Sequence, residues 1–175
     1  PRFGNANPER MQIALWEWMV RSQADPYYIR KSLGLPMNFP IAKGSGEEQE
    51  WERQPDWCCK ARFGASYTAL PDGRIICIAG EFEDHYDPNF CIYNDVIVMR
   101  PAPDEKWVTP NSGELEIYGY PPEVFPPTDG HAAVLVGSNI YIIGSVGYPG
   151  TRRPGTTPIR TLAALLLAGP ALSVS

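Results

Sequence analysis

A repeated β-hairpin is the feature of this sequence that most constrains its fold. Residues 62–80 contain an apolar segment, a turn at Asp72 and Gly73, and a second apolar segment that ends on Ala79 and Gly80. About 65 residues later, residues 129–145 repeat this arrangement. Aspartate followed by glycine between two apolar segments is a strong hairpin signal. The repeat therefore predicts an antiparallel β structure built from two related units.

Further strands are expected after each hairpin. When Gly64 is aligned with Gly130, the strand patterns of the second unit fall on those of the first. Residues 114–118 alternate with a period of two, as a half-buried strand should. The expected strands are 67–70, 75–78, 92–99 and 114–118 in the first unit, and 132–136, 140–143 and 157–162 in the second.

A long repeat of four strands punctuated by glycine is typical of the blades of a β-propeller. The chain has 16 glycines and 19 prolines among 175 residues, which indicates many turns and short strands. The expected fold class is therefore mainly β, with about two four-stranded antiparallel blades after a short helical segment. The first blade is assigned to residues 61–120, and the second, incomplete blade to residues 121–162. A single blade exposes two apolar faces, which only neighbouring elements can cover.

The N-terminal segment, residues 1–34, is expected to be helical from Asn7 onward. Asn7 is a favourable N-cap and Pro8 suits the first helical position. Asp25 before Pro26 predicts the start of a second helix, which Gly34 ends.

The first predicted helix has a wide apolar face, and the helical segment contains three aromatic residues. They are interpreted as packing surface rather than as a ligand-binding box. These residues are Trp16, Trp18 and Tyr28.

Residues 35–60 and 163–175 are expected to lie outside the packed domain. The first segment has no sheet periodicity and contains an acidic run, which predicts a mobile linker. An acidic partner-binding segment is the alternative. The apolar segment at residues 163–175 is shorter than the roughly 18 residues that a membrane helix needs, so we expect a short helix or a poorly packed terminus. Because the chain begins with proline, we expect a fragment or a processed product.

Charge and cysteine content narrow the class of protein. The net charge is −5, and no cluster of five or more basic residues occurs, so nucleic acid is not an expected partner. The spacing of Cys58, Cys59, Cys77 and Cys91 matches no zinc site. Reduced, buried thiols in a cytoplasmic protein are expected, with disulfides as the alternative. No membrane association is expected.

These features resemble kelch repeats. The resemblance rests on the small residues that end each hairpin, on Gly64 and Gly130 before the first strands, and on Asn94, Asp95 and Val96 at the start of the third strand. More narrowly, two stretches resemble uncharacterised bacterial kelch-like proteins, and the likeness covers about residues 8–162. These stretches are LPDGRIICIAGEFEDHYDPNFCIYNDV and FPPTDGHAAVLVGSNIYIIGSVGYPGTRRPGTTP. Neither unit has the usual two glycines after its second strand, and both units exceed the roughly 50-residue kelch period.

The resemblance implies a binding module that contacts its partner through loops at one end of the propeller. The loops after the second strand of each unit carry the candidate residues, which are Glu81, Glu83, Asp84, His85 and Asp87 in one and Tyr148, Arg152 and Arg153 in the other. The expected partner is a protein or a small polar ligand. The carboxylates could also hold a hard cation, or the loop could simply be solvated and paired with the arginines. An uncovered blade face predicts self-association.

An enzyme is the competing class. Because some propellers of this family are copper oxidases and others act on sialic acids, the resemblance also allows a fragment of a carbohydrate-active hydrolase or a metal-dependent oxidase. The sequence has no nucleophile elbow, phosphate-binding glycine loop or metalloprotease motif. His131 is interpreted as structural. No catalytic residue, cofactor or metal site is therefore assigned, and a fragment without independent function is the third alternative.

Overall fold

The computed structural model describes residues 3–35, 41–43, 50–52, 59, 62–82, 91–103, 112–144, 147 and 159–163. This part of the chain is mainly β, with antiparallel sheets and two short helices. The expected fold class is confirmed to that extent. The described residues form neither a closed barrel nor a propeller.

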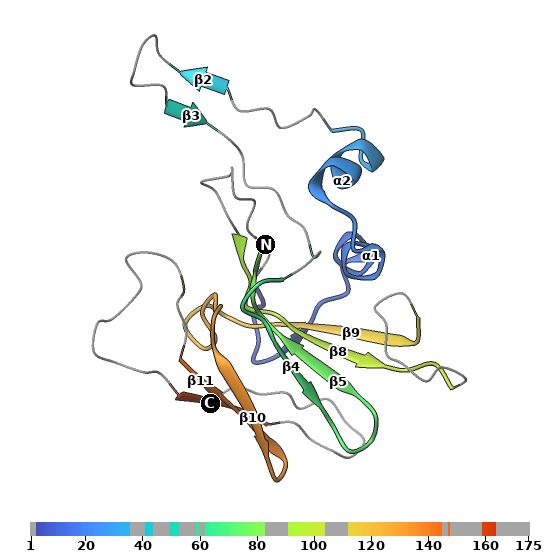
Figure 1. Cartoon of the computed structure of the whole chain (residues 1–175), viewed down its shortest axis with the longest axis vertical. Coiled ribbons are helices and arrows are strands. Elements are labelled where there is room, and N and C mark those ends of the chain that lie inside the picture. Colours follow the sequence, from blue (N-terminus) through green and yellow to red (C-terminus); the bar gives the residue numbers. More distant parts are fainter. Residues whose placement is uncertain are drawn as a thin grey trace.

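The first sheet has five strands in the order β1-β9-β8-β5-β4 (Figure 1). Their bounds are β1 (Glu9–Arg10), β4 (Ser66–Ala69), β5 (Ile75–Ile78), β8 (Val96–Arg100) and β9 (Glu114–Gly119). Strands β4, β5, β8 and β9 pair with one another in succession, all antiparallel. The predicted four-stranded unit is therefore present, with β1 as an unpredicted fifth strand.

The predicted helix start at Asn7 is wrong. Residues Glu9–Arg10 pair with β9 instead, and the N–H of Met11 donates to the carbonyl of Ile117 at 2.8 Å. Helix α1 (Ala14–Ser22) begins only after this pairing ends. The N-cap signal considers only neighbouring residues. The backbone groups of this segment instead form hydrogen bonds with a strand more than 100 residues away in the sequence, which a local signal cannot indicate.

Helix α2 (Pro26–Ser32) begins and ends as the sequence predicts. Its N-cap Asp25 accepts a hydrogen bond from the N–H of Tyr28 at 3.0 Å. Gly34 follows the helix with a φ of 64°, which favours glycine.

Only one of the three predicted packing aromatics is buried. Trp16 is 5% exposed, whereas Trp18 and Tyr28 are 36% and 57% exposed. The packing interpretation therefore holds for Trp16 and is wrong for Trp18 and Tyr28, because α1 buries Trp16, Met19 and Val20 and α2 buries Ile29.

The segment expected to be a linker contains two short strands, β2 (Ile41–Lys43) and β3 (Glu50–Glu52). They pair antiparallel, with Ile41 opposite Glu52, and they lie beyond α2 in Figure 1. The linker assignment of residues 35–60 stays a prediction, but these two strands were not expected. Strands of three residues are too short to show the alternation by which a strand is read from sequence.

The second sheet has three strands in the order β10-β11-β12. Strands β10 (Ala132–Val136), β11 (Asn139–Ile143) and β12 (Ile159–Ala163) agree with the predicted positions. The β10–β11 turn aligns Val136 with Asn139, and its Gly137 has a φ of 61°, which favours glycine.

The predicted strand at residues 92–99 is interrupted. Strand β7 (Cys91–Ile92) pairs with β6 (Glu81–Phe82), and β8 then begins at Val96. Residues 93–95 between them are irregular and almost fully buried.

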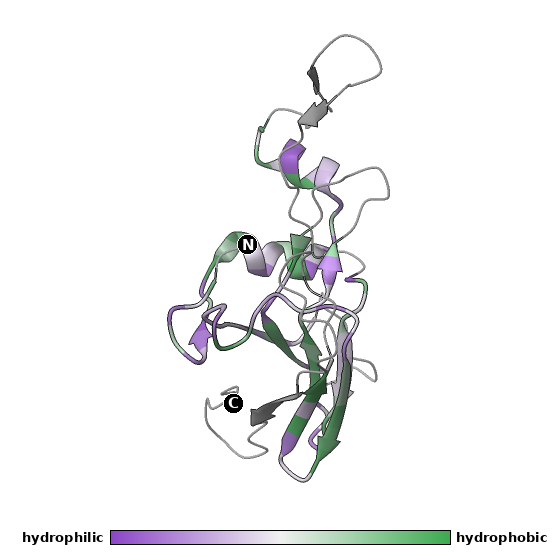
Figure 2. Cartoon of the chain, turned by 90° about the vertical axis from the view of Figure 1, so that its left-hand side faces the viewer, coloured by the Kyte–Doolittle hydropathy of each residue, from purple (hydrophilic) through white to green (hydrophobic). Residues whose placement is uncertain are grey.

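Alternate residues of the first sheet face two different cores. The inter-sheet core lies between the two sheets, and the helix-side core lies between the first sheet and α1 and α2. Figure 2 shows the hydrophobic residues concentrated in the strands. From β5, β8 and β9, the inter-sheet core receives Ile76, Ile78, Val96, Val98 and Tyr118, and the helix-side core receives Cys77, Ile97, Met99 and Ile117. The helices therefore cover the face that the second sheet leaves open.

The second sheet keeps an apolar outer face. Val134, Val136 and Ile143 are 47%, 56% and 37% exposed, whereas Ile140 and Ile142 on the other face are buried. None of the helices described is long and apolar enough to cross a membrane.

Candidate functional site

The two predicted binding loops begin at the same end of the sheets. The N–H of Gly80, at the start of the first loop, donates to the carbonyl of Thr128 at 2.9 Å. The N–H of Gly147, in the second loop, donates to Oδ1 of Asp129 at 2.6 Å. Both loop stems are thus held by the segment that leads into β10.

Two equivalent glycines of the repeat meet at this end. The N–H of Gly130 donates to the carbonyl of Gly64 at 3.0 Å, and the φ angles of these residues are 58° and 63°. A Cβ atom on Gly64 would overlap the backbone nitrogen of Gly130. Glycine is required here both for the left-handed backbone and for the close approach of the two sheets.

A serine–histidine pair lies beside the glycines and links β4 to the start of β10. Ser66 Oγ and His131 Nε2 are 2.8 Å apart, and the buried Nδ1 of His131 has no partner among the described residues. Burial lowers the pKa of His131, although the nearby Asp129 carboxylate acts in the opposite direction. The imidazole is therefore neutral at pH 7.

Of the predicted binding residues, the structure places only Glu81. It lies in β6, where its N–H and C=O exchange hydrogen bonds of 2.8 and 2.9 Å with Phe63. The other predicted residues lie outside the described part of the chain, and these are Glu83, Asp84, His85, Asp87, Tyr148, Arg152 and Arg153.

Sequence reasoning missed a buried ion pair on the helix side of the first sheet. The guanidinium of Arg62 pairs with both carboxylate oxygens of Asp95, and the Nη2–Oδ2 distance is 3.0 Å. The indole Nε1 of Trp16 donates to the same carboxylate at 3.0 Å. Burial by itself lowers the pKa of the Arg62 guanidinium. The neighbouring Asp95 carboxylate has the larger combined effect, so the pKa is raised. The ion pair thereby ties α1 to the start of β8.

Aromatic and sulfur groups surround this ion pair. The Arg62 guanidinium carbon lies 4.0 Å from the centroid of the Tyr93 ring, and Nη2 donates to the sulfur of Cys59 at 3.2 Å. Cys59, Cys77 and Cys91 are buried and free, as predicted, whereas Cys58 lies outside the described residues. Burial raises the pKa of Cys77 to about 11, which makes its thiolate scarce at neutral pH. The cluster therefore favours a structural rather than a nucleophilic role.

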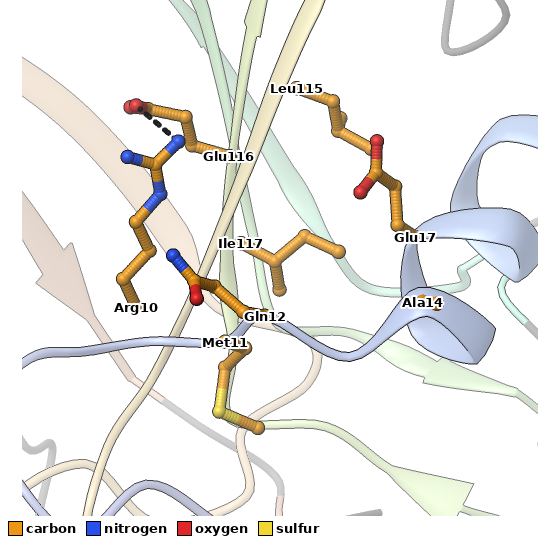
Figure 3. Close-up of a pocket in the computed structure, with 8 residues that line it drawn as sticks. All are labelled: Arg10, Met11, Gln12, Ala14, Glu17, Leu115, Glu116 and Ile117. Atoms are coloured by element: carbon orange, nitrogen blue, oxygen red, sulfur yellow. Dashed lines mark ion pairs between the residues drawn. The ribbon is translucent and has the colours of Figure 1, made fainter.

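A separate pocket lies at the opposite edge of the first sheet from β4. It has a volume of about 350 Å³, and Figure 3 shows its lining. The lining residues are Arg10, Met11, Gln12, Ala14, Glu17, Leu115, Glu116 and Ile117. An ion pair of 3.1 Å joins Arg10 to Glu116 at one side, and Glu17 stands at the other.

Within the described residues, no group of three or more His, Cys, Asp or Glu side chains is arranged to hold a metal ion. The acidic residues at 83–87 lie outside that part of the chain, so the predicted cation-binding alternative stays a prediction.

Comparison with protein-family models, with curated proteins and with solved structures finds no match to this chain. The resemblance to kelch repeats therefore stays a prediction, and the function is argued from the residues themselves.

Proposed function

We propose that the chain is a kelch-like interaction module, in which the two sheets act as propeller blades and the loops at one end bind a protein or a small polar ligand. One observation supports this most directly. Gly80 and Gly147, the stems of the two loops, are both hydrogen-bonded to residues 128–129. Loops anchored on a rigid scaffold commonly carry binding residues.

The composition of the loops suggests the chemistry of the ligand. The first loop has four carboxylates and His85, whereas the second has Arg152 and Arg153. Opposite charges on the two loops would favour a ligand that carries both a cationic and an anionic group, such as a charged peptide segment.

Charge reversal in the second loop tests this proposal. The full chain and its Arg152→Glu and Arg153→Glu variants are each used to capture partners, and the identified partner is then titrated by calorimetry. Binding should weaken about tenfold or more in each loop variant, since about 1.4 kcal/mol corresponds to tenfold. Lys31→Glu, an exposed position on α2, is the control with the same change of charge. Equal binding by all variants, or a loss only in Lys31→Glu, would contradict the proposal.

A propeller-enzyme fragment is the second candidate, and the Ser66–His131 distance of 2.8 Å is the observation that favours it. A serine nucleophile also needs its histidine oriented by a third group. Here the Oδ1 atom of Asp129 accepts from Gly147, and His131 Nδ1 has no partner within the described structure. A fluorophosphonate probe should therefore leave Ser66 unlabelled, and covalent labelling of Ser66 in the folded chain would favour the enzyme.

A further inference from the structure

A gap in the strand pairing of β9 marks a second site, independent of the loops. The carbonyl of Ile117 accepts from Met11, and the carbonyl of Gly113, just before the strand, accepts from Arg21 Nη1 at 3.3 Å. Alternate residues of a strand direct their N–H and C=O groups to the same edge. Leu115 lies two residues from Ile117, so its backbone groups face this edge as well. No group in the described part of the chain is hydrogen-bonded to them.

The pocket of about 350 Å³ lies at this gap. Such a volume is at the lower end of the usual range for small-ligand sites. Leu115 and Ile117 supply apolar surface from β9, and Ala14 at the start of α1 lines the pocket as well. Figure 3 shows Arg10 and Glu116 on one side and Glu17 on the other, with Ile117 between them. The site thus combines an open strand edge, an apolar floor and a polar rim.

We infer that this site binds a short extended peptide of a partner protein, which adds to β9 in line with β1. Main-chain hydrogen bonds to Leu115 would provide affinity, as in other cases of strand addition to a sheet edge. The gap is short, because Met11 bounds it at one end and Arg21 at the other. It accepts one central residue and the flanking peptide groups.

The sheet geometry also specifies the side chains of the peptide. The residue opposite Leu115 shares the face of Leu115, which packs against the helix-side core, so an apolar residue is favoured there. The carboxylates of Glu114 and Glu116, on the opposite face, are already paired with Arg100 and Arg10, so they specify no charge for the flanking residues. The preferred ligand is therefore an apolar residue between two peptide groups.

A small ion fits the same site less well. The charged groups of the lining are already paired, Arg10 with Glu116 at 3.1 Å and Glu17 with Arg21 at 3.0 Å. The backbone of Leu115, by contrast, offers both a donor and an acceptor. A peptide satisfies both of these groups, whereas a simple anion or cation satisfies only one.

The test titrates the isotope-labelled full chain with acetyl-valine methylamide, which has one residue between two peptide groups, and follows the backbone amides by NMR. We expect weak, saturable binding in the range of about 1 mM, with the largest shifts at Gln12, Ala14 and Leu115. Hydrogen exchange at the Leu115 N–H should slow as the peptide binds. The matched control peptide carries N-methylvaline, which cannot donate to the Leu115 carbonyl, and it should bind about tenfold more weakly.

Two variants complete the test. Ala14→Phe places a large side chain at the pocket and should abolish peptide binding, whereas Ser22→Phe at the far end of α1 should bind as the unmodified chain does. Both positions are exposed, and an unchanged thermal melt checks that the fold is kept. Equal binding of the N-methylated peptide, shifts confined to other parts of the chain, or undiminished binding by Ala14→Phe would each overturn the inference.

Discussion

The two faces of the first sheet are covered in different ways. On the inter-sheet face, Ile76 and Val98 pack against Ile140 and Ile142 of β11 within a core of apolar side chains. On the helix-side face, α1 is held by Trp16, whose indole donates to the buried Asp95–Arg62 pair. One interface therefore depends on apolar packing, and the other adds a buried network of charged and polar groups.

This difference has consequences for specificity. Apolar packing stabilises many related arrangements and tolerates changes that keep volume. A buried ion pair stabilises less than its Coulomb energy suggests, but loss of one partner leaves an uncompensated charge. We therefore expect the helix-side face to respond abruptly to single substitutions in the network, and the inter-sheet face to respond in proportion to the volume removed.

The largest effect is expected from Asp95→Ala. This substitution leaves the Arg62 guanidinium buried without its carboxylate, at a cost of about 3 to 5 kcal/mol in the free energy of unfolding. Urea unfolding followed by tryptophan fluorescence measures it. Glu114→Ala is the matched control, since Glu114 is 80% exposed and pairs with Arg100 at 3.5 Å; its cost should stay below about 1 kcal/mol. Similar costs for the two variants would mean that the buried network does not distinguish the faces.

Ile142→Ala probes the inter-sheet face. Ile142 is 1% exposed, and its truncation should cost about 2 to 5 kcal/mol through lost burial and the cavity left behind. The neighbouring Ile143 faces outward and is 37% exposed, so Ile143→Ala should cost about 1 kcal/mol or less. Denaturation of both variants checks this, and a larger cost for Ile143→Ala would show that the outer face is covered.

A smaller effect is expected from Trp16→Phe, which keeps an aromatic ring but removes the indole N–H donated to Asp95. Hydrogen bonds to charged groups contribute about 1.5 to 3 kcal/mol. Loosening of α1 should also speed alkylation of Cys77, whose pKa of about 11 and burial protect it in the folded chain. Mass spectrometry after iodoacetamide treatment measures this rate. Ile142→Val serves as the control on the other face, and faster alkylation there than in Trp16→Phe would contradict the assignment.

The smallest effect concerns pH and the link between the sheets. Because burial lowers the pKa of His131 in the folded chain, the unfolded chain binds this proton more readily. The contribution of His131 is therefore fully present above its usual pKa of about 6.5 and is lost as the pH falls toward the lower folded value. His131→Gln should show a weaker loss of stability between neutral and mildly acidic pH in urea titrations. An identical pH dependence of stability in His131→Gln and in the unmodified chain would refute this role of His131.

Local patterns were sufficient to predict the longer strands of the two sheets, but not β1. The alternation at residues 114–118 correctly predicted β9, and the Asp72–Gly73 turn signal correctly predicted the pairing of β4 with β5. Both signals depend only on residues that are close together in the sequence. The equivalence of Gly64 and Gly130 also followed from the repeat. The contact between these two glycines could not be predicted, because a local sequence pattern does not indicate which elements pack against each other.

The buried ion pair and the β1–β9 pairing were missed because their partners lie far apart in the chain, whereas β2 and β3 were missed because they are short. Asp95 lies 33 residues from Arg62 and 79 from Trp16, and each residue alone has an ordinary local context. The loop residues at 83–87 remain predictions, since only Glu81 of the acidic set lies in the described structure. One sequence signal for the ion pair was available. Asn94 and Asp95 lie within an apolar run, and polar residues that are buried there need hydrogen-bond partners.

The pairing of β1 with β9 has a consequence for how the chain is made. Glu9 is paired with Gly119, so a ribosome must add 110 residues after β1 before its partner strand exists. At common rates of translation this takes roughly 5 to 22 seconds. Until β5 and β8 have been made, the apolar side of α1 has no sheet to pack on. A nascent chain in this state exposes apolar surface of the kind that chaperones bind.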